Sequence, residues 1–201
     1  MGEMDLMSGL LFPTLYTVVG ALIGGIFAFL IAKRGFSDNA LNKGKTYIHL
    51  LGRDAEMIAK KSIELLEIGD INSCKDVGIE TLMGIWGYKV EKFDTQMKMF
   101  KVHWDTYKEN IMSCSMKHVC RNKGKRKKYN EIISNMLDLY NEILICQGVL
   151  NQVQEKYRNL KENERKKYIE SEMNEVLSYI RRLRVQCKEM RKNLDNEAAL
   201  Y

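Results

Sequence analysis

The side chains best suited to chemistry in this 201-residue chain are the thiols of Cys114 and Cys120 and the imidazole of His118 between them. Thiolate sulfur and imidazole nitrogen are ligands that suit zinc. On a helix, Cys114 and His118 share one face, but Cys120 lies on another, and no fourth ligand lies nearby in the sequence. We therefore regard Cys114, His118 and Cys120 as a weak metal candidate, and we expect no metal and no cofactor.

Other motifs give little support to catalysis. Gly44-Lys45-Thr46 imitates the end of a phosphate-binding loop, but Asn39 stands where that loop has its first glycine, and no strand precedes it. The remaining cysteines are scattered singly, which is typical of small core residues in a reducing compartment. We therefore expect that the protein is not an enzyme.

A strongly basic segment, residues 117–128, reads KHVCRNKGKRKK and contains no acidic residue. Repulsion between these cations requires either full solvation or a counter-anion, such as a lipid headgroup or a nucleic-acid phosphate. The segment is thus a candidate for contact with anionic lipid or phosphate, and a solvated loop tip is the alternative. Its seven basic residues are Lys117, Arg121, Lys123, Lys125, Arg126, Lys127 and Lys128.

A long apolar run lies near the N-terminus and would place the basic segment relative to a membrane. Residues 6–32 carry no charged side chain, and Lys33 and Arg34 follow directly. Because about 20 apolar residues match the hydrocarbon thickness of a bilayer, we expect a transmembrane helix over residues 9–34, after a short tail over residues 1–8. The excess of basic residues after the run predicts a single-pass protein of the cell inner membrane, with its N-terminus outside and residues 35–201 in the cytoplasm.

Small residues recur every four positions along this run. Such residues let two transmembrane helices approach closely, so we expect a homo-oligomer or a partner transmembrane helix, although glycine and alanine are also common in membrane spans. The expected packing face consists of Gly20, Ala21, Gly24, Gly25, Ala28 and Ala32.

The rest of the chain predicts an all-α fold. It contains no proline, and its apolar residues recur at alternating steps of three and four. We expect helices at about residues 45–68, 73–119, 128–162 and 165–196, in an elongated antiparallel bundle or coiled-coil hairpin. Large side chains in the seam of the second helix indicate a packed core rather than a ligand-stacking row. They are Trp86, Phe93, Phe100, Trp104 and Tyr107.

Chain direction favours lipid as the partner of the basic segment. The first cytoplasmic helix runs away from the membrane and the second returns, so the loop after it should face the bilayer again. Contact between residues 117–128 and membrane lipid is therefore favoured, and nucleic acid is a less favoured partner.

These features predict two classes of function. In the first, the chain is a membrane-anchored helical scaffold or adaptor that self-associates through its transmembrane helix and engages cytoplasmic protein partners. In the second, it is an oligomeric membrane effector or a channel-forming subunit, whose cytoplasmic bundle regulates a pore. The uncharged run in residues 6–32 argues against a charge relay built by this helix alone.

Overall fold

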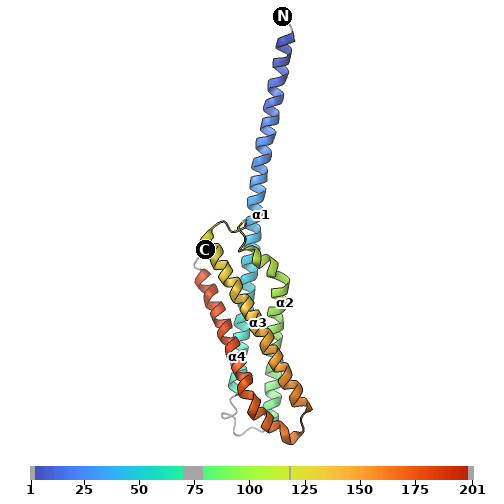
Figure 1. Ribbon diagram of the computed structural model, residues 1–201, viewed down its shortest axis with the longest axis vertical. Helices are drawn as coiled ribbons and strands as arrows, with labels where there is room; N and C mark the ends of the chain where they lie inside the picture. Colours follow the sequence, from blue (N-terminus) through green and yellow to red (C-terminus); the bar gives the residue numbers. More distant parts are fainter. Residues whose placement is uncertain (1–2, 70–78, 118, 199–201) are drawn as a thin grey trace.

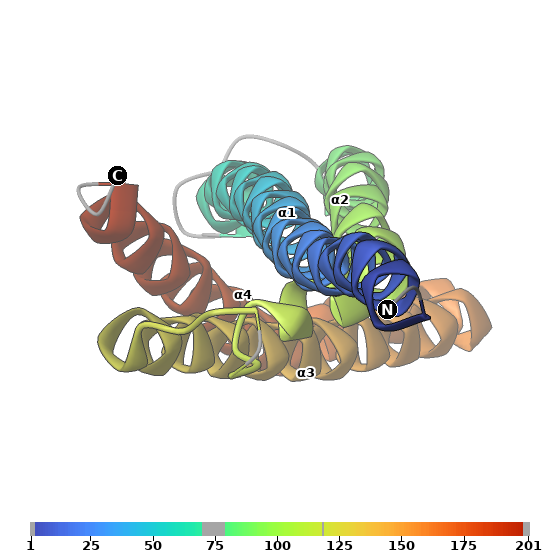
Figure 2. The same ribbon diagram turned by 90° about the horizontal axis from the view of Figure 1, so that it is seen from above.

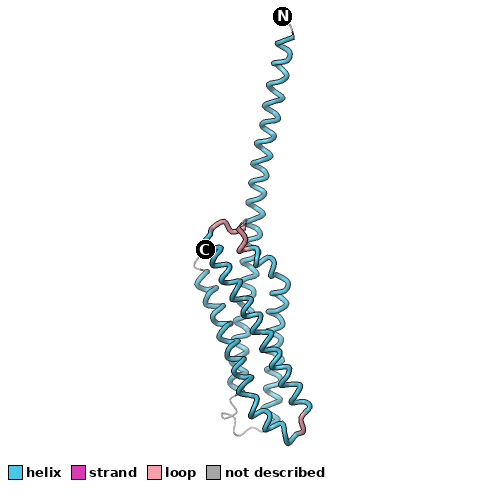
Figure 3. The backbone as a smooth tube through the Cα atoms, in the orientation of Figure 1, coloured by secondary structure: helices cyan, strands magenta, loops and turns pink. Residues whose placement is uncertain are grey.

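The computed structural model describes residues 3–69, 79–117 and 119–198, and in these ranges it contains four α-helices and no strand. The helices are α1 (Glu3–Gly69), α2 (Ile79–Ser113), α3 (Lys123–Asn159) and α4 (Glu162–Ala198). They alternate in direction and form one elongated bundle, from which the N-terminal part of α1 projects (Figures 1 and 3). The prediction of an all-α bundle is therefore confirmed.

The four helices follow one another around the bundle. α1 packs against α2 and α4, and α3 packs against α4 and, less extensively, against α2. Viewed from above, α1 lies beside α2, and α3 lies on the opposite side of the bundle (Figure 2). The turn between α2 and α3 lies at the end where α1 leaves the bundle, as does the C-terminal end of α4 (Figure 1).

The structure has one helix where the sequence indicated two. We predicted separate helices over residues 9–34 and 45–68, but α1 runs without a break through the segment between them. That segment contains no proline, and its residues Ser37, Leu41 and Gly44 contact the end of α2 and the turn that follows. The helix continues because these tertiary contacts outweigh the two glycines, 35 and 44, that weaken its propensity.

The predicted ends of the other helices also need correction. α2 ends at Ser113 rather than at residue 119, because the next amides donate to carbonyls three residues back, as in Cys114 N to Ile111 O at 3.1 Å. α3 begins at Lys123 rather than at residue 128, because the Asn122 side chain caps its first turn. The break predicted between residues 162 and 165 lies at residues 160–161, and the predicted start of the second helix at residue 73 lies outside the described residues.

The core of the bundle is continuous along its length and is built from the predicted seams. Trp86, Phe93, Phe100 and Trp104 are buried, and Tyr107 is half-buried and stacked on Tyr47 with ring centroids 4.0 Å apart. Burial of such apolar surface supplies the main stabilisation of the fold. These seam residues therefore pack the helices together.

Candidate membrane-contact site

The N-terminal part of α1 is the one stretch, within the described residues, that is long and apolar enough to cross a membrane by length and composition. From Gly20 to Phe36 every side chain is exposed. A Cβ atom added at Gly20, Gly24 or Gly25 would meet nothing within 4 Å. The whole predicted packing face, which also includes Ala21, Ala28 and Ala32, is therefore open to lipid or to another helix.

The basic segment joins the end of α2 to the start of α3, beside the place where α1 leaves the bundle (Figure 1). Asn122 ends the turn, and its Oδ1 accepts a hydrogen bond from the amide of Lys125 at 3.0 Å. In this way the cap fixes where α3 starts and places four of the predicted lysines, Lys123, Lys125, Lys127 and Lys128, in its first two turns. The side chains of Lys117, Arg121, Lys123, Lys125 and Lys127 are exposed, and those of Arg126 and Lys128 are half-buried.

A hydrogen bond attaches this turn to α1. The Ser37 hydroxyl of α1 donates to the backbone carbonyl oxygen of Val119 at 2.9 Å, and both residues are buried. Because an unpaired buried carbonyl is costly, this bond favours one position of the turn against α1. Ser37 was not identified from the sequence, since a lone serine in a polar stretch carries no signal for a contact 82 residues away.

A close helix–helix approach lies next to this bond. A Cβ atom at Gly44 would overlap the Sγ atom of Cys114 and would lie 2.7 Å from the backbone oxygen of Asn110. The Cys114 thiol donates to the carbonyl oxygen of Leu41 at 3.7 Å. Gly44 is therefore needed for close packing of α1 on α2, which is a different role from the phosphate-loop glycine that its motif imitates.

The weak metal candidate is not assembled by the described residues. Burial raises the pKa of the Cys114 thiol to about 11, so at neutral pH it is protonated and bonded to a carbonyl rather than a thiolate. Cys120 is also buried, and its thiol contacts the backbone oxygen of Asn122 at 3.6 Å. His118 lies outside the described residues, and no group of three or more His, Cys, Asp or Glu residues within them could hold a metal ion.

Polar contacts align α1 with α2 below the turn. Asp54 Oδ2 lies 2.6 Å from His103 Nδ1, and Glu64 Oε2 accepts a hydrogen bond from Lys89 at 2.5 Å. Glu64 also accepts from Lys61, and the two lysines hold the pKa of its carboxyl near 2. The contacts Asp54–His103 and Glu64–Lys89 cross from α1 to α2, so they help to fix the register of α1 on α2.

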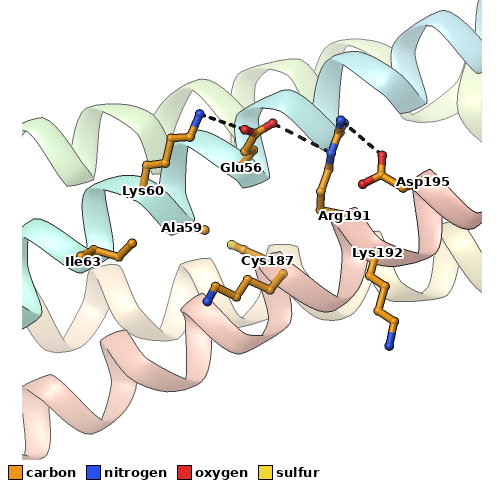
Figure 4. Close-up of a pocket in the computed structure, with 9 residues that line it drawn as sticks. Glu56, Ala59, Lys60, Ile63, Cys187, Arg191, Lys192 and Asp195 are labelled. Atoms are coloured by element: carbon orange, nitrogen blue, oxygen red, sulfur yellow. Dashed lines mark ion pairs between the residues drawn. The ribbon is translucent and has the colours of Figure 1, made fainter.

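A cavity of about 380 Å³ lies between α1 and α4, on the side of the bundle away from α2 (Figure 4). Ala59, Ile63 and Cys187 line it with apolar groups. Burial raises the pKa of the Cys187 thiol, which therefore stays protonated. No sequence motif indicated this cavity, since its lining comes from two helices that are far apart in the sequence.

Charged residues surround the mouth of the cavity. Glu56 Oε1 pairs with Lys60 at 2.9 Å, and Glu56 Oε2 lies 3.9 Å from Arg191 (Figure 4). Arg191 also pairs with Asp195 at 3.3 Å. The hydrogen bond from Lys60 lowers the pKa of the Glu56 carboxyl, so the rim is ionised and largely self-paired at neutral pH.

Comparison with known proteins adds no assignment. No family model, no curated protein and no solved structure matches the chain.

Proposed function

We propose that this chain is a single-pass protein of the cell inner membrane and that it serves as an anchored helical scaffold for cytoplasmic partners. The observation that carries the proposal is the continuity of α1, a single helix from Glu3 to Gly69 that contains both the apolar run and the first helix of the bundle. A continuous helix transmits position and orientation from the membrane to the bundle, as a scaffold requires. The basic residues after the run support an N-terminus outside and a bundle in the cytoplasm.

The open small-residue face supports self-association of the anchor. Gly20 and Gly24 are four residues apart and have no neighbours within 4 Å of an added Cβ atom. In a bilayer, such a face lets a second helix approach closely enough for extensive van der Waals contact. Eighteen residues make five whole turns of a helix, so Asp38 and Asn42 lie on the same helical face as Gly20 and Gly24. Both are exposed, so the bundle does not block this approach.

A second apolar face supports a protein partner for the bundle. Ile85, Tyr88, Met99 and Val102 of α2 are exposed, by 43% to 61% of their accessible surface. Their separations of three, eleven and three residues are close to whole turns, so they lie along one side of α2, away from its buried seam. An apolar helix face of this kind suits docking of a partner helix.

The oligomeric state of the full-length chain in mild detergent tests self-association. Native mass spectrometry should give an oligomer for the wild-type protein and a monomer for Gly24→Leu, because the larger side chain prevents close approach of the helices. Gly84→Leu is the matched control, because Gly84 lies in the bundle and is equally open, so this variant should stay oligomeric. A wild-type monomer, or equal oligomers in both variants, would contradict self-association through the anchor.

The alternative is an oligomeric effector in which several spans line a pore regulated by the bundle. The uncharged, small-residue face of the span supports it as well as it supports a scaffold. Ion leakage from vesicles that contain the purified chain separates the two. Leakage that Gly24→Leu abolishes would favour the pore, whereas an oligomer without leakage would favour the scaffold.

A further inference from the structure

We propose that the end of the bundle next to the membrane is a second membrane-contact surface, a basic collar that binds the anionic headgroups of the bilayer crossed by α1. The inference rests on the proposed function, because it requires α1 as the anchor. Three segments contribute to the collar: the end of the apolar run, the α2–α3 turn and the first turns of α3. Its members are Lys33, Arg34, Phe36, Met116, Lys117, Arg121, Lys123, Lys125 and Lys127.

The attachment of the α2–α3 turn to α1 determines how close the turn lies to the bilayer. Val119 is bonded to Ser37, which lies four residues, or about 6 Å along the helix, beyond Lys33 at the end of the apolar run. The headgroup layer on each side of a bilayer is roughly 5–7 Å thick. The hydrogen bond therefore holds the turn at the inner edge of the headgroup layer, where a lysine or arginine side chain reaches lipid phosphates.

Most charges of the collar have no ion-pair partner among the residues that the structure describes. Residues 117–128 include no acid, and among the residues that the structure describes only Lys127 of the collar's turn and helix forms an ion pair, with Glu131 at 4.0 Å. Both side chains of that pair are largely exposed, so water screens it. Anionic headgroups would neutralise these cations, and each basic residue near such a surface favours contact by about fivefold.

Two exposed apolar side chains distinguish a membrane from nucleic acid. Phe36 is 74% exposed and Met116 is 45% exposed, and both lie at this end of the bundle. Apolar groups among basic residues at a bilayer surface insert into the boundary between headgroups and acyl chains. Phe36 lies four residues, or about 6 Å along the helix, beyond the end of the apolar run at Ala32, so in an anchored protein the headgroup region of the bilayer occupies the space beside it. The surface therefore suits lipid better than a nucleic acid.

The far end of the bundle provides a matched comparison. The α3–α4 turn and its neighbours also expose basic side chains, but this turn lies at the opposite end from the point where α1 emerges (Figure 1). Anchoring through α1 would keep these residues tens of ångströms from the bilayer. Four of them, all exposed, equal in number the basic residues to be changed in the collar: Lys156, Arg158, Lys161 and Lys167.

Hydrogen exchange of the full-length chain in lipid nanodiscs tests the collar. Amides of residues 114–122 are compared in discs of phosphatidylcholine alone and in discs that also contain phosphatidylglycerol. We expect at least about fivefold slower exchange of the turn in the anionic discs, and no change at residues 156–167. The slowing should disappear when Arg121, Lys123, Lys125 and Lys127 are all changed to Gln, and it should persist when Lys156, Arg158, Lys161 and Lys167 are changed instead.

Three other outcomes of the exchange experiment would each overturn a different part of the proposal. Equal exchange of the turn in the two discs, with the core amides of α2 still protected, would overturn the collar while leaving the anchor intact. Failure of the chain to enter discs would instead overturn the proposed function. Slower exchange in neutral discs on addition of a short RNA, without a response to phosphatidylglycerol, would overturn lipid contact in favour of nucleic acid.

Discussion

The two halves of α1 belong to one helix but have opposite surroundings. From Gly20 to Phe36 every side chain is exposed, whereas from Ser37 onward one face is buried against α2 and α4. The same residue types therefore have different roles in each half. Leu30 is 53% exposed and Leu51 is fully buried, although both are leucines on the same helix. Whether a side chain faces open surroundings or a neighbouring helix therefore decides what it contributes.

Glycine shows the contrast most clearly. Gly24 has open space around it, but Gly44 lies against α2 and Gly52 lies against Leu194 of α4. In the bundle, the missing side chain lets helices approach within the protein. In the apolar half, the missing side chain would let a helix of another molecule approach closely.

The largest expected difference in stability between the halves comes from replacing a leucine with alanine. Leu51→Ala should lower the free energy of unfolding of the bundle by about 2–5 kcal/mol, because it leaves a cavity in a tightly packed core. Leu30→Ala should leave bundle stability unchanged. Thermal unfolding in mild detergent, followed by the fluorescence of the buried Trp86 and Trp104, measures both. Equal effects of the two substitutions would show that the halves are not distinct.

Glycine substitutions should give the next largest difference. Gly44→Ala should destabilise the bundle by about 1–3 kcal/mol, because its Cβ atom would overlap both a side chain and the backbone oxygen of Asn110. Gly52→Ala should cost less, since its Cβ atom meets only the flexible end of Leu194, at 2.5 Å. Gly24→Ala should have no destabilising effect on the bundle. The same fluorescence melts test this order, and a Gly24→Ala variant as unstable as Gly44→Ala would contradict it.

Loss of the hydrogen bond between Ser37 and Val119, at the boundary between the halves, should have a smaller effect on the stability of the bundle. Ser37→Ala removes the donor to Val119 O and leaves a buried carbonyl oxygen without that hydrogen bond, which should cost about 1 kcal/mol. Thr46→Ala is the control, because the Thr46 hydroxyl bonds only locally to Asn42 O and is exposed. Hydrogen exchange should also speed up at residues 114–122 in the Ser37 variant. An unchanged turn would show that this bond does not hold it against α1.

The smallest expected effect is a pH dependence from Glu64. Hydrogen bonds from Lys61 and Lys89 lower the pKa of its carboxyl to about 2, so its stabilisation is complete above the usual pKa of 4.5 and is lost as the pH falls toward 2. Because 32% of the side chain is exposed, screening by solvent limits the contribution to at most about 1 kcal/mol.

Glu64→Gln should therefore lower the melting temperature at pH 6 and flatten its change between pH 4.5 and pH 2. Lys89→Gln removes one of the two donors and should give an intermediate profile. If Glu64→Gln follows the wild-type melting profile throughout this range, the ion pairs of Glu64 do not stabilise the fold.

Periodicity along the chain predicted most of the architecture. The apolar run, the seams and the turn near residue 160 are local patterns, and local patterns determine helices. The seam from Trp86 to Tyr107 lies in the core because its heptad spacing permits only one buried face.

Features that depend on contacts between distant residues could not be predicted in the same way. The bond from Ser37 to Val119 and the fit of Gly44 against Cys114 depend on how α1 meets α2, which no local pattern contains. For the same reason, the sequence did not establish that α1 continues between residues 34 and 45, since the contacts that keep it helical there come from the end of α2 and the turn that follows. The cavity beside Cys187 likewise depends on how α1 and α4 pack together.

The most direct test of the account measures whether α1 is one continuous helix from the span into the bundle. Spin labels carried by noncanonical amino acids at positions 30 and 57, both exposed, are separated by 27 residues, or about 40 Å along a helix. Double electron–electron resonance on the doubly labelled full-length chain, diluted with excess unlabelled chain in nanodiscs so that only distances within one chain are measured, should give a narrow distribution at about 40 Å. A broad distribution, or one centred well below that distance, would show that the anchor and the bundle are joined by a flexible segment and would contradict the account.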